Sequence, residues 1–154
     1  MLSPVAASPD HIVRVRRFNR FYTREVGLLR KTFLDTPWSL GEMRVLYEIA
    51  HGAGLAASDV ARELELDAAY LSRLLQRLQQ EGLILRQRSA ADGRVSHLRL
   101  SAKGRRLFAA ADARQVGHTT AMLERLAPAD RARLVDAMAT IEALLRPSAP
   151  PVAA

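Results

Sequence analysis

The chain has 154 residues, of which 49% are hydrophobic but only 5% aromatic; this is the length of one domain and the composition of an aliphatic, helix-rich protein. It contains no cysteine, which excludes disulfides, thiolate metal sites and cysteine-based catalysis or redox sensing. The formal net charge of +7 is unevenly spread: residues 11–31 (seven basic, one acidic) and 66–106 (nine basic, three acidic) each carry +6, whereas residues 32–65 (two basic, six acidic) carry −4.

Residues 1–9 contain two prolines among small side chains and are expected to be flexible. A long helix is predicted over residues 11–33, capped by Asp10 and ended by Asp35-Thr36-Pro37. Its helical spacing gives one apolar stripe opposite a face rich in arginine. The stripe consists of Val15, Phe18, Tyr22, Val26 and Leu29.

A second helix is predicted from the sequence Ser39-Leu40-Gly41-Glu42, which has the pattern of a capping box. The helix should run to about His51, where Gly52-Ala53-Gly54 ends it. Its inward-facing residues are expected to be Leu40, Met43, Leu46, Ile49 and Ala50. Leu55-Ala56 is a candidate for a short edge strand.

Two short helices, 57–64 and 68–81, follow, separated by a turn at 65–67, and together they predict a helix-turn-helix. Leucines at i, i+3, i+4 and i+7 give the second of these helices a core face. Its opposite face is small, polar and basic, with no acid before Glu81, which is typical of a helix that enters a DNA major groove. An ordinary solvated face is the alternative. The candidate DNA-binding residues on this helix are Ala68, Ala69, Tyr70, Ser72, Arg73, Gln76 and Arg77.

Two alternating runs, 83–88 and 95–100, predict a β-hairpin whose tight turn contains Asp92-Gly93. Arg94 follows the turn directly, where an arginine could enter a minor groove. The candidate DNA-binding residues here are Arg86, Arg88, Asp92 and Arg94. Asp92 is expected to hold Arg94 or a neighbouring arginine in a set rotamer rather than to contact DNA.

Two further helices are predicted, 102–126 with Ser101 as its cap and 128–146 with Pro128 in its first turn. Leu134, Met138, Ile141 and Leu145 repeat with nearly a heptad spacing, which indicates a packing surface between subunits. Packing within the chain is the alternative. The resulting fold class is mainly α with a small β-hairpin wing: one winged helix-turn-helix domain over residues 10–146, with its DNA-binding part at 39–100, long terminal dimerisation helices and a flexible tail at 147–154.

The chain resembles the multiple-antibiotic-resistance regulator (MarR) family over about residues 11–146. The resemblance rests on Leu64–Arg73, Leu78–Ile84, Asp92-Gly93-Arg94 and Leu98–Gly104. It implies a homodimer whose first and last helices interlock, bound to a pseudo-palindromic operator in double-stranded DNA with half-sites about one helical turn apart. It further implies transcriptional control, usually repression, relieved by a small molecule.

The resemblance also implies an effector pocket where the first, second and fifth helices meet, often for an anionic aromatic compound. Candidate ligand-binding residues on the matching elements are Asn19, Trp38, Arg44, Tyr47 and His51. Simpler roles compete: Trp38 and Tyr47 are more often core residues, and His51 would interact favourably with a helix dipole. The four histidines lack metal-ligand spacing, so neither a metal nor another cofactor is expected.

Two other functions remain open. Residues 17–25 resemble regulators fused to a GNAT-type acetyltransferase, although the Pro/Ala-rich tail favours a stand-alone relative; the other alternative is a non-specific DNA-coating protein. A free-standing enzyme is not expected, because no phosphate-binding glycine loop, nucleophile elbow or His–carboxylate cluster is found. Apolar runs are too short to span a membrane and the N-terminus lacks a secretion signal, so a cytoplasmic location without a membrane partner is expected.

Overall fold

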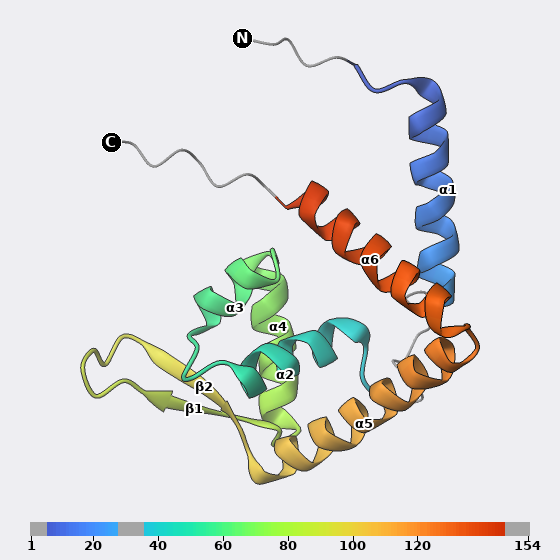
Figure 1. The fold of residues 1–154 in the computed structure, drawn as a ribbon. Helices are drawn as coiled ribbons and strands as arrows, with labels where there is room; N and C mark the ends of the chain where they lie inside the picture. The colour runs from blue at the N-terminus through green and yellow to red at the C-terminus, as the bar shows by residue number, and fades with distance from the viewer. Residues whose placement is uncertain (1–5, 28–35, 147–154) are drawn as a thin grey trace. The chain divides into compact units, whose positions relative to one another are not determined.

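The computed structural model describes residues 6–27 and 36–146. Its elements are, in order, α1 (Pro9–Glu25), α2 (Leu40–His51), α3 (Ala57–Glu63), α4 (Ala68–Gln80), β1 (Ile84–Arg88), β2 (Ser96–Leu100), α5 (Ala102–Glu124) and α6 (Pro128–Leu145) (Figure 1). The predicted fold class, mainly α with one β-hairpin, is confirmed. The chain divides into two compact units, Met1–Asp112 and Ala113–Ala154, and the boundary falls within α5.

Helix α1 begins earlier and ends earlier than its sequence pattern predicts. Ser8, not Asp10, is the cap: its hydroxyl accepts a hydrogen bond from the amide of His11 at 3.2 Å, and Pro9 occupies the first turn. The helix ends at Glu25 because Gly27 adopts a positive φ of 70°, which closes a helix C-terminus without steric cost. The predicted continuation over 28–33 lies outside the described residues. No residue of α1 is buried.

The core of the first unit is built by α2, α3, α4 and the root of the hairpin. The capping box at the start of α2 is confirmed, since Ser39 and Glu42 each accept from the other's amide, at 3.2 and 2.8 Å. Ala50 is exposed rather than inward, whereas Trp38 is buried. The buried core residues of α2, α3 and α4, together with Trp38 just before α2, are Trp38, Met43, Val45, Leu46, Ile49, Val60, Leu71, Leu75 and Leu78.

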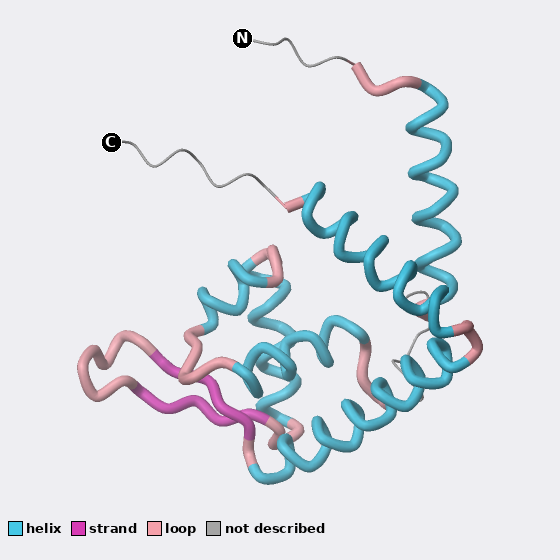
Figure 2. Tube along the Cα trace, in the orientation of Figure 1, coloured by secondary structure: helices cyan, strands magenta, loops and turns pink. Residues whose placement is uncertain are grey.

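The hairpin pairs β1 with β2 antiparallel, with Ile84 opposite Leu100 and Arg88 opposite Ser96, and it projects away from α2, α3 and α4 (Figure 2). Its root is buried, because Ile84, Leu98 and Leu100 enter the core. The predicted edge strand at Leu55-Ala56 is reduced to one bridge between Ala56 and His97, beside a 2.8 Å hydrogen bond from the amide of Leu98 to the carbonyl of Leu55.

The start of α5 is tied to the end of α4. As predicted, Ser101 caps α5 by accepting from the amide of Gly104 at 2.9 Å. The same hydroxyl donates to the carbonyl of Gly82 at 2.6 Å, and Lys103 donates to the carbonyl of Glu81 at 2.7 Å. These bonds fix the root of the hairpin between two helices.

Helix α6, in the second unit, begins with Pro128 in its first turn as predicted and has no buried residue. The packing surface predicted on this helix is only partly buried: Leu134 and Met138 are half-buried, whereas Ile141 and Leu145 are 39% and 77% exposed. No described helix is long and apolar enough to cross a membrane.

Candidate nucleic-acid interface

Helix α4 separates a buried leucine face from an open polar face. Asp67 begins the helix by accepting from the amide of Tyr70 at 2.9 Å, and Gly82, with a φ of 71°, follows its end. Because Leu71, Leu75 and Leu78 are 1% exposed or less, the rotation of α4 on the core is fixed. All seven α4 residues predicted to contact DNA are exposed: Ala68, Ala69, Tyr70, Ser72, Arg73, Gln76 and Arg77.

The wing presents the remaining predicted DNA-binding residues. Arg86 and Arg88 lie two residues apart on β1, and Arg94 lies in the loop that joins the strands; all three are exposed. Because strand side chains alternate, Arg86 and Arg88 extend from the same face of the hairpin.

The role predicted for Asp92 requires correction. Its carboxylate accepts a 2.9 Å hydrogen bond from the backbone amide of Arg94 and makes no ion pair with an arginine among the described residues. Ser89 supports the same turn by accepting from the amides of Ala91 and Asp92. A short side chain at this position satisfies a nearby amide more readily than it reaches a guanidinium, so the turn is shaped while the side chain of Arg94 remains free.

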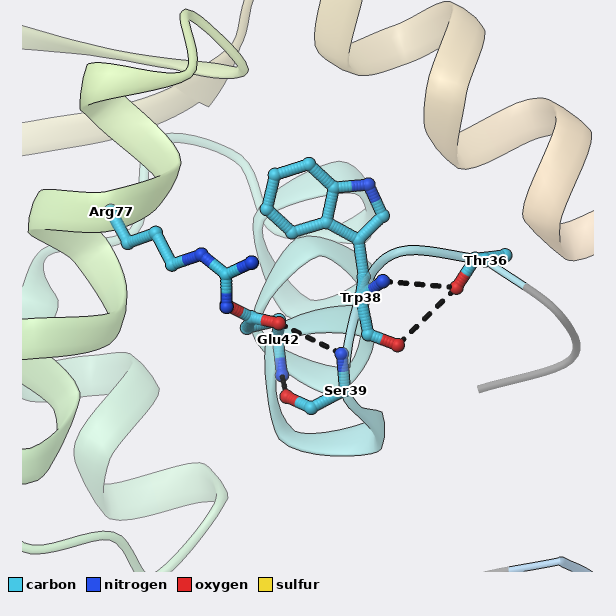
Figure 3. A network of polar contacts seen from close by, with 5 residues as sticks. All are labelled: Thr36, Trp38, Ser39, Glu42 and Arg77. Atoms are coloured by element: carbon cyan, nitrogen blue, oxygen red, sulfur yellow. Dashed lines mark hydrogen bonds and ion pairs between the residues drawn. The ribbon is translucent and has the colours of Figure 1, made fainter. Parts of the chain in front are cut away.

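Arg77 differs from the other arginines of this surface because its guanidinium is engaged within the chain. One of its nitrogens lies 2.6 Å from the carboxylate of Glu42, and its carbon lies 5.1 Å from the centroid of the Trp38 ring (Figure 3). Over the described part of the chain, Arg73, Arg86, Arg88 and Arg94 form no ion pair. Sequence patterns did not identify the Glu42 contact, which joins residues 35 positions apart.

The five candidate ligand-binding residues are divided among several environments. Trp38 is a core residue, 6% exposed, while Asn19 lies exposed on α1 and Arg44 is exposed on α2. Only Tyr47 and His51 are shown in contact: their rings stack with centroids 4.1 Å apart, and each lies edge-on to Phe108 of α5. The Nδ1 atom of His51 also lies 2.9 Å from the carbonyl oxygen of Tyr47.

A cavity of about 430 Å³ adjoins this aromatic cluster, at the end of α2, the end of β2 and the first turns of α5. Within the part of the chain that the structure describes, two arginines, a histidine and several apolar side chains line it, and no carboxylate does. The lining residues are Ile49, Ala50, His51, Gly52, Arg99, Leu100, Arg105 and Phe108. Arg99, Arg105 and Phe108 were not predicted from the sequence as ligand-binding residues; the i, i+3 spacing of the last two was the available signal. Among the described residues, no group of three metal-ligating side chains is found.

The arrangement of α2, α3, α4 and the β1–β2 wing defines a winged helix-turn-helix protein. A comparison with family models gives a match to the MarR family over residues 35–95. Over that segment the chain is therefore similar to the MarR family.

Known proteins support the same classification. An HTH-type transcriptional regulator, YdgJ of Bacillus subtilis, is 25% identical over 101 residues, which are 66% of this chain and 62% of that protein. Among solved structures, FabT of Streptococcus pneumoniae in complex with DNA has a TM-score of 0.66 at 24% identity, covering 88% of this chain and 94% of its own.

Two further structures share the fold and carry or respond to ligands. PcaV of Streptomyces coelicolor, in complex with its natural ligand, has a TM-score of 0.62 at 23% identity, covering 91% of this chain and 96% of its own. BpsR of Bordetella bronchiseptica, whose DNA binding is regulated by 6-hydroxynicotinic acid, has a TM-score of 0.65 at 22% identity, covering 82% and 96%.

Proposed function

We propose that this protein is a dimeric, sequence-specific transcriptional repressor that a small aromatic acid releases from DNA. The observation that carries the DNA-binding part is the exposed, acid-free face of α4 beside a wing with three exposed arginines, Arg86, Arg88 and Arg94, that form no ion pair within the described residues. Small side chains on α4 permit close approach to base edges, and Arg73 and Gln76 can donate to them. Arginines on the wing supply phosphate and minor-groove contacts.

The exposed apolar side chains of α1 and α6 support the dimer. Helix α1 exposes six large apolar or aromatic residues: Ile12, Val13, Val15, Phe18, Phe21 and Tyr22. Helix α6 exposes Ile141, Leu144 and Leu145 to between 39% and 78%. Two helices without a buried residue are unusual in a folded monomer, and apolar surface of this kind marks a protein interface. A second copy of the chain would cover it and would bring two α4 helices to two half-sites.

The function is tested with DNA selected by the protein from a random-sequence duplex pool. Affinity for a selected duplex and for random duplex is measured at matched salt, because phosphate contacts make both salt-dependent. A regulator should prefer the selected duplex by at least about 10³-fold, and the selected site should be pseudo-palindromic. Equal affinities would instead establish a DNA-coating protein. Placing the selected site over a reporter promoter then tests repression.

The cavity beside Tyr47, His51 and Phe108 is the proposed effector site. Ile49, Leu100 and Phe108 offer apolar surface to a ring, while Arg99 and Arg105 offer guanidinium groups to a carboxylate. Arg105 is already oriented, since it donates to the carbonyl of Leu100 at 3.2 Å. The regulation of BpsR by an aromatic acid supports the same ligand class.

Benzoate, salicylate and 6-hydroxynicotinate serve as probes, with uncharged benzamide for comparison. A ligand releases DNA only if it binds the DNA-incompetent arrangement better. We expect at least one of the acids to lower affinity for the selected duplex about tenfold, within the usual range of allosteric coupling, and benzamide to have no effect. Arg105→Met should abolish the response, whereas Arg106→Met, a change at a neighbour outside the cavity lining, should preserve it. A response that survives Arg105→Met would remove the cavity from the mechanism.

A further inference from the structure

One flank of α4 lies against the first turn of α2. Tyr70, Leu74 and Arg77 occur at i, i+4 and i+7 and therefore share one stripe of the helix, beside the face proposed to read DNA. A Cβ atom added at Gly41 would lie 3.3 Å from the hydroxyl of Tyr70 and 4.0 Å from a methyl group of Leu74. The small residue at position 41 thus lets α4 approach α2 closely.

The Arg77 end of this stripe is held by a buried charge. Glu42 is only 1% exposed, and its two carboxylate oxygens accept from different elements: one from the amide of Ser39 at 2.8 Å, the other from Arg77 at 2.6 Å. A carboxylate that is buried and charged requires such partners, because removing one leaves an uncompensated charge. The ion pair therefore constrains where α4 can lie.

The same guanidinium lies over the ring of Trp38, which is 6% exposed, so Arg77 is held from two sides (Figure 3). Cation–π contact adds a preference for one position of the guanidinium plane. An arginine fixed by a carboxylate and an indole has little freedom to follow a DNA phosphate. Its placement instead adds to the constraint that the buried leucines put on the rotation of α4 about its own axis.

We propose that Arg77 and Glu42 form a positioning pair that sets the orientation of α4, so that Arg77 acts on sequence recognition through Ser72, Arg73 and Gln76. This inference rests on the proposed DNA-reading function of α4. Contacts to base edges require placement to within about 0.5 Å, a tolerance that loosening of α4 would exceed. Contacts to phosphates tolerate larger displacements of α4, since they depend mainly on charge.

The test compares Arg77→Met, Glu42→Gln and the double variant, each as the full chain. Met preserves helix propensity, and Gln preserves the capping box. We expect Arg77→Met to lower affinity for the selected duplex about tenfold, the order expected when one base contact is misaligned, while affinity for random duplex and its salt slope stay unchanged. Arg62→Met is the control, because Arg62 pairs with Asp59 on α3 at the surface.

Two outcomes would overturn the proposal. Equal losses on selected and random duplex, with a salt slope reduced by about 0.9, would make Arg77 a phosphate contact. No loss on either duplex would reduce the pair to a purely structural role.

A second measurement does not depend on DNA. Trp38 is the only tryptophan in the chain, so its fluorescence reports the guanidinium above it. Arg77→Met should shift the emission whereas Arg62→Met should not, and the double variant should regain part of the stability that Arg77→Met loses in urea. Unmoved emission and additive losses would show that the pair is not formed, even if DNA recognition is intact. Absence of any preference for a selected duplex would instead refute the proposed function. The Trp38 emission and the urea stabilities would still show whether the Arg77–Glu42 pair is formed.

Discussion

Gly104, in the first turn of α5, is the position where one added methyl group should be most costly. A Cβ atom there would lie 2.0 Å from the carbonyl oxygen of Leu83 and 2.9 Å from its carbonyl carbon. Ordinary carbon–oxygen contact begins near 3.3 Å, so the start of α5 and the root of the wing would have to separate by more than about 1 Å. Both contacting atoms belong to the backbone and cannot rotate away.

The separation would stretch two hydrogen bonds across the same junction. The amide of Ser101 donates to the carbonyl of Leu83 at 2.9 Å, and the hydroxyl of Ser101 donates to the carbonyl of Gly82 at 2.6 Å. Overpacking costs about 1–3 kcal/mol, and each lost bond about 1 kcal/mol more. Replacing glycine by alanine in a helix returns up to about 1 kcal/mol. The expected net loss for Gly104→Ala is therefore about 2–4 kcal/mol.

Urea unfolding measures this loss as a lower midpoint at an unchanged m-value. Gly117→Ala is the matched control, because Gly117 lies in the same helix with no atom within 4 Å of an added Cβ. It should raise stability by about 0.5–1 kcal/mol through helix propensity alone. If Gly104→Ala were as stable as Gly117→Ala, the close approach of α5 to Leu83 would be refuted.

Three further substitutions test the surface and the caps. Arg94→Ala should weaken binding to selected and random duplex alike and lower the salt slope by about 0.9; unchanged affinity would contradict its placement on the wing. Arg73→Ala should cost about 1–3 kcal/mol on the selected duplex if it reads a base, whereas an equal loss on every sequence would make it a phosphate anchor. The pKa of Asp59 lies below its usual 3.8, first because its carboxylate accepts from the amide of Ala56 and then because Arg62 is nearby. Asp59→Ala should therefore be less stable than the wild type at neutral pH, and the difference should shrink as the pH falls below 3.8 towards the lower folded-state pKa. If the difference in free energy of unfolding between the two proteins, measured in urea, did not change with pH, the cap that Asp59 forms with the amide of Ala56 would be contradicted.

The amino-acid sequence by itself determined the order and type of the elements from α2 to α6. Local signals carry that information: the capping box at Ser39, the cap at Ser101, the glycine at position 82 and the helical spacing of leucines in α4 act within a few residues of themselves. The exposed face of α4 followed directly, because a helix with one leucine stripe on the core must present the opposite stripe to solvent.

The tertiary structure decided which side chains meet. The sequence places Arg77 on the open side of α4, but Glu42, 35 residues away, draws its guanidinium to the start of α2. Likewise Tyr47 and His51 join an aromatic cluster with Phe108 of α5, which packs edge-on against both, and His51 and Phe108 line the cavity. Local propensity carries no information about partners of this kind, since a contact between distant residues depends on how complete elements pack.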